Sequence, residues 1–128
     1  MKNRTNVSSG AKWEDIVGYS RAVKIGNIIE ISGTTAVDED NNIVGIDNAY
    51  EQTKFILAKV EKVLEKLGAS LENVIRTRMF VTNIADWQLI GKAHGEFFSK
   101  IKPATSMVEV SRLIDPQLLV EIEMSAII

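Results

Sequence analysis

The sequence predicts an α+β fold in which two helices cover one face of a mixed β-sheet. Two segments, 47–67 and 86–100, have apolar residues at helical spacing, and the stretches around them are short and rich in β-branched residues. The predicted order is strand, strand, helix, strand, helix, strand, strand. With 128 residues, 45% apolar content and no repeat or linker, the chain is expected to form a single domain over residues 1–128.

Two β-branched runs are predicted to form a first hairpin. They span 19–22 and 27–33 and are separated by a Lys-Ile-Gly stretch that suits a turn. The polar segment 1–10 is expected to be mobile until Trp13 anchors the chain. After the hairpin, residues 38–42 combine Asp and Asn, whose side chains can bond the nearby backbone, so a turn is predicted there.

The segment 47–67 is predicted to form an amphipathic helix. Asn48 followed three residues later by Glu51 matches a capping box at its start. A second helix is predicted over 86–100, ended by Pro103. Apolar positions three and four residues apart in or next to the two segments are Ala49, Ile56, Val60, Val63, Leu67, Ile90, Ala93, Phe97 and Ile101.

Three further strands are predicted in the second half of the chain. The run 74–82 alternates and is interpreted as a central strand. The last two strands, 106–111 and 118–127, are joined by a turn at Ile114-Asp-Pro116. One face of the central strand is expected to carry Val74, Arg76, Arg78 and Phe80.

The face of the sheet without helices is predicted to be apolar. It would expose Met107, Leu119, Ile127 and their neighbours over an area larger than a monomer normally tolerates. Self-association is the expected remedy.

Three glutamates lie inside the last two predicted strands: Glu109, Glu121 and Glu123. A carboxylate in an apolar strand costs free energy unless it is paired, hydrogen-bonded or exposed to a wet cleft. We expect Glu109 to pair with Arg112 as part of the scaffold. For Glu121 two interpretations stay open, a cross-strand ion pair with Arg76 or Arg78, or a base that holds water in a cleft.

Composition excludes several function classes. Fifteen basic and seventeen acidic residues give a net charge of −2, which provides no attraction to a phosphate backbone, so nucleic acid is not an expected partner. Without cysteine and with His94 as the single histidine, no metal site or cofactor is expected. The N-terminus lacks the apolar run of a signal peptide and no stretch is long enough to span a bilayer, so a cytoplasmic protein without membrane partner is expected.

The last quarter of the chain carries the most specific pattern. It runs from Pro103-Ala-Thr-Ser106 through Val108-Glu-Val-Ser-Arg-Leu113 and closes with Glu121-Ile-Glu123. Together with Ile28–Thr34 and Val74–Val81, this pattern resembles the Rid/YjgF family, also labelled endoribonuclease L-PSP, over nearly the whole chain. The resemblance implies a chorismate-mutase-like (YjgF/L-PSP-like) fold that assembles as a homotrimer around a central barrel, with ligand clefts between subunits.

Members of this family with the archetypal activity hydrolyse imines or enamines derived from amino acids and release ammonia and a 2-oxo acid. The resemblance gives Glu121 the role of the water-positioning carboxylate and places Tyr19, Ser32 and Gly33 in the cleft. The family's anchor for the substrate carboxylate is an arginine directly after Pro-Ala, and this position is Thr105 here. A hydroxyl carries no charge, so a contact of about 1.5 to 3 kcal/mol is lost.

Two more cleft positions depart from the family pattern. Gly91 replaces an asparagine on the second helix, and Met107 replaces a frequent cysteine. Arg78 could reach the cleft as a substitute anchor, or serve as counter-ion to the glutamates. His94 could be a proton donor at the cleft, or a helix histidine without such a role.

Three functions are therefore weighed. The first is a trimer that binds a small carboxylate-bearing metabolite and hydrolyses an imine-like bond with altered specificity. The alternative is a non-enzymatic small-molecule sensor or protein-interaction trimer. A ribonuclease ranks third, because the sequence shows no basic groove, histidine pair or aromatic row for stacking bases.

Overall fold

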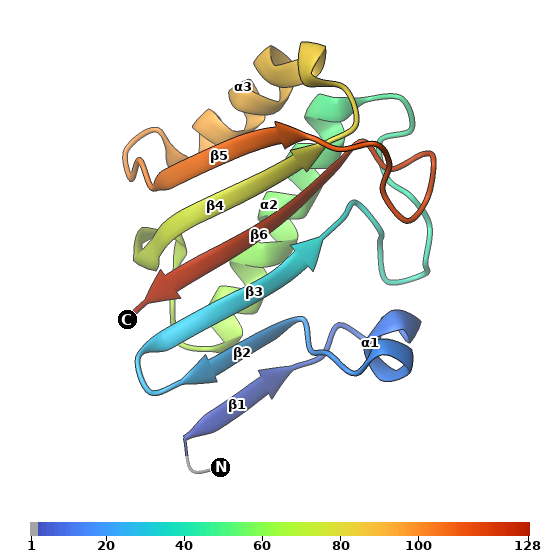
Figure 1. Cartoon of the computed structure of the whole chain (residues 1–128). Coiled ribbons are helices and arrows are strands. Elements are labelled where there is room, and N and C mark those ends of the chain that lie inside the picture. Colours follow the sequence, from blue (N-terminus) through green and yellow to red (C-terminus); the bar gives the residue numbers. More distant parts are fainter. Residues whose placement is uncertain (1–2) are drawn as a thin grey trace.

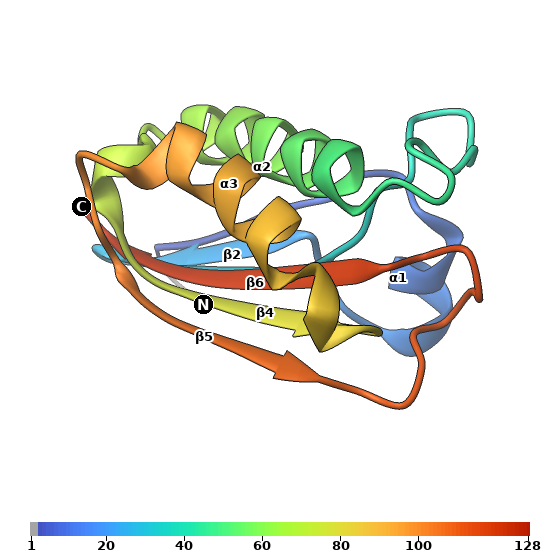
Figure 2. The ribbon, with the colours of Figure 1, turned by 90° about the horizontal axis from the view of Figure 1, so that it is seen from above.

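The computed structural model describes residues 3–128 and shows a six-stranded mixed sheet covered on one face by two helices (Figure 2). The strand order is β1-β2-β3-β6-β4-β5, and all neighbours are antiparallel except the parallel pair β4 and β5 (Figure 1). This architecture confirms the predicted α+β fold. The strands are β1 (Arg4–Val7), β2 (Ala22–Ile25), β3 (Ile28–Thr34), β4 (Val74–Val81), β5 (Ala104–Glu109) and β6 (Val120–Ile127).

The two covering helices are α2 (Ala49–Lys66) and α3 (Trp87–Phe98), close to the predicted bounds. The side chain of Asn48 accepts a hydrogen bond from the amide of Glu51 at 3.0 Å, as expected for the start of α2. A short helix, α1 (Lys12–Val17), and two 3₁₀ turns, η1 (Leu71–Asn73) and η2 (Ile84–Asp86), complete the fold.

The core lies between the sheet and the helices α2 and α3. Alternate residues of the central strands point into it, as the period of two in a strand requires. Fully or nearly fully buried members are Ile29, Ile31, Ile56, Leu57, Val60, Leu64, Met79, Val81, Ile90, Val120, Ile122 and Met124.

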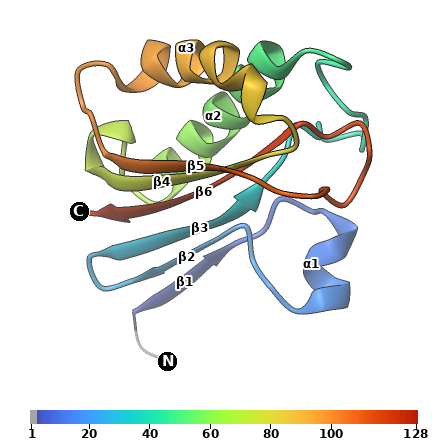
Figure 3. The ribbon, with the colours of Figure 1, turned by 45° about the horizontal axis from the view of Figure 1, so that its top comes forward.

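The N-terminal segment is more structured than predicted. Residues 1 and 2 of the expected mobile stretch lie outside the described residues, but 4–7 form β1, which pairs antiparallel with β2. Figure 3 shows this strand at one edge of the sheet and α1 beside it, away from α3. Strand β1 could not be recognised in the sequence, because it lies at the edge of the sheet and three of its four positions are exposed. It therefore has no apolar pattern.

The first hairpin is shifted from its predicted position. Its strands are 22–25 and 28–34, so the turn lies at Gly26 and Asn27 and the strand predicted at 19–22 only begins at its end. Gly26 has a φ of 59°, which glycine adopts without strain and which a tight hairpin turn requires.

The predicted alternation of β4 is wrong at its start. Val74 is buried and Ile75 is exposed, although Arg76, Arg78 and Phe80 face outward as expected. The pairing of β4 with β6 shifts register between Val74 and Arg76, and such an irregularity moves the residues before it to the opposite face.

The open face of the sheet is apolar only in part, and two of the three residues predicted for it lie elsewhere. Met107 and Leu119 pack against the core instead of facing water, and only Ile127 of the three is exposed. Because β5 pairs with β4 in parallel register, Met107 lies next to the buried Met79. The open face carries polar residues such as Arg78, Glu123 and Ser125, and also the exposed apolar residues Ile25, Ile28, Val108 and Ile127. Within residues 3–128, no helix combines the length and apolar content needed to cross a membrane.

Candidate functional site

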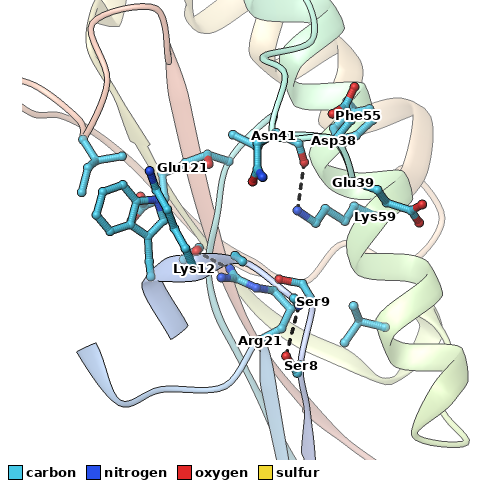
Figure 4. Close-up of a pocket in the computed structure, with 18 of the residues that line it drawn as sticks. Ser8, Ser9, Lys12, Arg21, Asp38, Glu39, Asn41, Phe55, Lys59 and Glu121 are labelled. Carbon is cyan, nitrogen blue, oxygen red and sulfur yellow. Dashed lines mark hydrogen bonds between the residues drawn. The ribbon is translucent and has the colours of Figure 1, made fainter. Parts of the chain in front are cut away.

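A cavity of about 880 Å³ lies where the N-terminal segment, the loop after β3, α2 and the start of β6 meet (Figure 4). Glu121 and Arg21 line the middle of it, and Phe55 and Lys59 contribute from α2. Trp13 lies on its wall and is 40% exposed. The cavity thus combines apolar walls with a carboxylate and cations, the composition that small-molecule sites share.

Glu121 packs directly over Gly33 of the neighbouring strand. A Cβ added at Gly33 would lie 2.9 Å from Cδ and 3.2 Å from Cγ of Glu121, so any larger residue would force the Glu121 carboxylate out of this position. Burial raises the pKa of the Glu121 carboxyl, an effect that the charge of Arg21 reduces and that of Glu123 increases. A carboxyl of raised pKa in a cavity is a candidate for proton transfer.

Arg21 is the buried cation of the cavity, with 5% of the residue exposed. Its Nη1 donates to the carbonyl oxygen of Gly33 at 2.6 Å and to Thr34 Oγ1 at 3.1 Å. Its Nη2 lies 3.3 Å from the Tyr19 hydroxyl and 3.6 Å from a Glu14 carboxylate oxygen. Its Nε is buried without a partner among residues 3–128. The guanidinium is therefore held firmly at Nη1, which makes the shorter contacts, and more loosely at Nη2, which makes the longer ones.

Glu14 ties the N-terminal segment to this arginine. Its carboxylate accepts hydrogen bonds from the hydroxyls of Ser8 and Ser9 and from the Ser9 amide. Burial acts to raise the pKa of Glu14, but these hydrogen bonds and the Arg21 charge together lower it. An ionised Glu14 thus fixes residues 8–14 as one wall of the cavity.

Lys59 provides a second cation on the opposite wall. Its Nζ donates to the carbonyl oxygen of Val37 at 3.0 Å. Burial, and next the charge of Arg21, lower the pKa of this amine. Both cations lie on the same cavity as Glu121, so an anion there meets positive charge from two directions.

The residues predicted for the site fall into two groups. Tyr19, Gly33 and Glu121 all line the cavity, and Ser32 lines a shallow hollow beside it together with Tyr19. The hydroxyl of Ser32 donates to the Ser20 carbonyl oxygen at 2.6 Å. These members therefore come together as expected.

The second group lies on the helix-covered side of the sheet, between β4, the edge strand β5 and α3, whereas Glu121 shares the other side with Arg78 and Glu123. There Thr77 Oγ1 is 2.9 Å from His94 Nε2 and 2.7 Å from Thr105 Oγ1. Gly91 lies one turn before His94 in α3, and Met107 follows Thr105 along β5. In a single chain, this group does not share the cavity of Glu121.

Arg78 lies on the open face of the sheet. Its Nη1 is 3.6 Å from Glu123, the residue opposite it on β6, and its side chain is 38% exposed. This is the counter-ion arrangement considered from the sequence. Glu121 is opposite Phe80, and among residues 3–128 it forms no ion pair.

The expected pair of Glu109 and Arg112 is wrong. Glu109 accepts a hydrogen bond from the Ile84 amide at 3.0 Å, at the start of η2. An exposed carboxylate at the first amides of a turn satisfies donors that have no partner within the turn, so this glutamate does not need an arginine.

Sequence reasoning missed Arg21, Glu14 and Lys59. A signal for Arg21 existed, because it is a charged residue inside a segment predicted as a strand, the same oddity that singled out Glu121. Glu14 and Lys59 gave no such signal, since a glutamate in a polar segment and a lysine on an amphipathic helix are usually exposed. Within residues 3–128, no group of three or more metal-binding side chains comes together.

The comparisons with known proteins agree with this fold. The family model described as endoribonuclease L-PSP matches residues 10–128. The chain belongs to this family, which is also called Rid/YjgF. The crystal structure of Rv2704 from Mycobacterium tuberculosis, a member of the YjgF/YER057c/UK114 family, is similar with a TM-score of 0.89 and 46% identity, covering 98% of this chain and 99% of that one.

Two relatives known from sequence show how far the similarity extends. The chain is 36% identical to the uncharacterized protein SCO2049 of Streptomyces coelicolor over 120 residues, which cover 94% of this chain and 89% of the relative. It is 34% identical over 104 residues to the 3-aminoacrylate deaminase RutC of Acinetobacter baylyi, covering 81% of this chain and 82% of that enzyme.

Proposed function

We propose that this protein binds a small carboxylate-bearing metabolite beside Glu121 and hydrolyses its C=N bond, as an imine or enamine deaminase of altered specificity. The observation that carries the proposal is the carboxyl of raised pKa in a cavity with the buried cation Arg21. The relationship to a 3-aminoacrylate deaminase supports the substrate class, because an aminoacrylate is an enamine that carries a carboxylate.

Glu121 is the proton acceptor in this proposal. Water attacks the C=N carbon of the iminium form while one of its protons passes to Glu121, and the product is a carbinolamine. Glu121 then returns this proton to the nitrogen, and the C–N bond breaks with its electron pair on the departing ammonia while the carbinolamine hydroxyl loses its proton and becomes the C=O group of the oxo acid. A carboxyl whose pKa is raised toward the working pH performs both transfers more easily than an ordinary one.

The substrate carboxylate needs a cation, because Thr105 provides none. Arg21 is the first candidate, since its Nη2 edge has only the longer contacts to Tyr19 and Glu14 and can take up a carboxylate oxygen. Arg78 is the second, because its exposed ion pair with Glu123 contributes little stability and is readily exchanged.

We further propose a homotrimer with clefts between subunits. Thr77 and Thr105 face α3 and lie outside the cavity that Glu121 lines, so we infer that a cleft containing both groups is formed by two copies of the chain. Family membership supports this arrangement. Native mass spectrometry and light scattering are expected to show a trimer, and a monomer at micromolar concentration would contradict this part of the proposal.

The decisive assay measures ammonia from 2-aminoacrylate and from 3-aminoacrylate generated in the sample by other enzymes. We expect release by the wild type to exceed the spontaneous rate and to fall at least about a hundredfold in Glu121→Gln. Glu72→Gln, at an exposed glutamate of η1 outside the cavity lining, is the matched control and should retain activity. Equal rates for wild type and Glu121→Gln would refute the role of Glu121.

A non-enzymatic sensor is the second candidate function. The contacts that Arg21 already makes favour this function. Because the guanidinium bonds Gly33, Thr34, Tyr19 and Glu14, it has fewer donors left to bind a substrate carboxylate. Binding of 2-oxobutyrate measured by calorimetry, without ammonia release from either enamine, would favour this function. Loss of binding in Arg21→Lys but not in Arg78→Lys would identify Arg21 as the residue that holds the ligand carboxylate. Lysine keeps the positive charge but cannot make the two parallel hydrogen bonds of a guanidinium.

A further inference from the structure

A second polar cluster lies under α3, apart from the Glu121 cavity. Thr77 Oγ1 is 2.9 Å from His94 Nε2 and 2.7 Å from Thr105 Oγ1, so three side chains from α3, β4 and β5 form one continuous chain of hydrogen bonds. Thr77 is fully buried, whereas Thr105 is exposed. The cluster therefore connects a largely buried imidazole to a hydroxyl on the surface.

The hydrogen bonds that link Thr105, Thr77 and His94 can run in either direction. Burial lowers the pKa of His94, so its ring is neutral at pH 7 and one nitrogen donates while the other accepts. If Nε2 accepts from Thr77, the Thr77 oxygen accepts from Thr105, and Thr105 presents an acceptor to the outside. If Nε2 donates to Thr77, each hydroxyl donates to the next, and Thr105 presents a proton.

The environment holds the imidazole in place for this role. The His94 ring packs on Phe98 with centroids 4.7 Å apart, which restricts its rotation. Thr77 is locked between β6 and β5 within the sheet. Both contacts of the Thr77 hydroxyl are made to side chains, so the backbone ladder of β4 does not use this hydroxyl.

We propose that Thr105, Thr77 and His94 form a proton relay whose outer end contacts the oxygen of the bound metabolite. This inference rests on the proposed function. As the carbinolamine collapses, its hydroxyl proton passes to Thr105 Oγ1, the Thr105 proton passes to Thr77, and the Thr77 proton passes to His94 Nε2. The C=O bond forms as the C–N bond breaks, and His94 later gives its proton to the released ammonia, so the iminium and water become a 2-oxo acid and ammonium.

The relay also explains how this chain can use threonine at the anchor position. A threonine alone offers one weak donor, but a threonine coupled to an imidazole can accept a proton and hand it on. The substrate position that the family pattern gives to an arginine would then serve proton transfer, while the carboxylate is held elsewhere.

The test uses nitrogen NMR of His94, whose signals are unambiguous because the chain has one histidine. Saturating 2-oxobutyrate should shift the tautomer toward protonated Nε2, since each hydroxyl then donates toward the ligand oxygen. Thr77→Val should abolish this response while leaving the affinity for 2-oxobutyrate within about threefold. Thr77→Ser should restore it.

A matched control is Thr53→Val, which removes another fully buried threonine hydroxyl, bonded to the Ala49 carbonyl oxygen in α2, far from the relay. It should leave the His94 response intact. For turnover, Thr77→Val should lower kcat about a hundredfold with KM nearly unchanged, and Thr77→Ser should stay close to wild type.

The outcomes separate this inference from the proposed function. If 2-oxobutyrate binds and His94 does not respond, or responds equally in Thr77→Val, the relay is refuted and the proposed function stands. If His94 responds through Thr77 but no enamine is hydrolysed, the relay at the ligand oxygen is supported and the deaminase function fails. If 2-oxobutyrate does not bind at all, both are overturned.

Discussion

Replacing Gln52 with leucine tests how the segment that leads into Glu121 is held. Gln52 is fully buried in α2. Its Nε2 donates to the carbonyl oxygens of Gly45 at 3.1 Å and Gln117 at 2.9 Å, and its Oε1 accepts from the Leu119 amide at 2.9 Å. Leucine has a similar volume but none of these bonds, so three backbone groups lose a partner.

The expected loss of stability follows from these contacts. Gly45 keeps a second partner, because its carbonyl oxygen also accepts from the Asn48 amide at 2.9 Å. The Gln117 carbonyl and the Leu119 amide each lose a bond, at about 1 to 3 kcal/mol per group when water does not replace it. The greater burial of apolar surface by leucine offsets about 1 to 2 kcal/mol. We therefore expect Gln52→Leu to lower the free energy of unfolding by about 2 to 3 kcal/mol.

Urea unfolding followed by tryptophan fluorescence and circular dichroism measures this quantity. Gln117→Ala is the control, because the contact with Gln52 uses the backbone of Gln117 and not its exposed side chain, and it should change stability by less than about 0.5 kcal/mol. A loss below about 0.5 kcal/mol in Gln52→Leu would refute the reasoning, since it would mean that these bonds are replaced by water at no cost.

Three further predictions concern the cavity. Gly33→Ala should displace the Glu121 carboxylate and weaken 2-oxobutyrate binding at least about tenfold, whereas Gly91→Ala, whose added Cβ meets no atom within 4 Å, should stabilise α3 by about 0.5 to 1 kcal/mol. Because the pKa of Glu14 is lowered by folding, its carboxylate stabilises the fold above the ordinary value of 4.5 and this contribution disappears in acid. Glu14→Gln should therefore lower the urea midpoint at pH 7, and this deficit should shrink as the pH falls below 4.5; a deficit that does not change with pH would contradict this. Because the pKa of Glu121 is raised by folding, its contribution is complete below 4.5 and is lost as pH rises, so Glu121→Gln should be at least as stable as wild type at pH 7, with the difference vanishing in acid.

The fold could be predicted from the sequence wherever one face of an element is buried. The helix 49–66 and the strand 74–81 carry apolar periods of 3.6 and 2 that arise directly from packing against a core. The edge strand 4–7 has no buried face to leave such a trace. The irregular pairing at Val74 could not be predicted either, because it depends on the register of β6 and not on the sequence of β4 alone.

The candidate site was predictable only in part for a related reason. Glu121 could be chosen because a charge in a strand is unusual, whereas Gly33 was predicted only through the family resemblance; the two residues do pack together. The partners of Glu121 depend on which elements meet at the cavity, and this includes Arg21 and the loop with Val37. Only the tertiary fold decides that Thr77 contacts both His94, 17 positions away, and Thr105, 28 positions away.

One wall of the cavity is built differently from the rest. Residues 8–14 are held there by the Glu14 carboxylate and its bonds to Ser8, Ser9 and Arg21, whereas Glu121 and Gly33 belong to the centre of the sheet. Substitutions in residues 8–14 would change the shape of the cavity around a ligand, but they would not disturb the hydrogen bonds between the strands that hold Glu121. Selectivity and chemistry can therefore diversify independently among proteins that share this sheet.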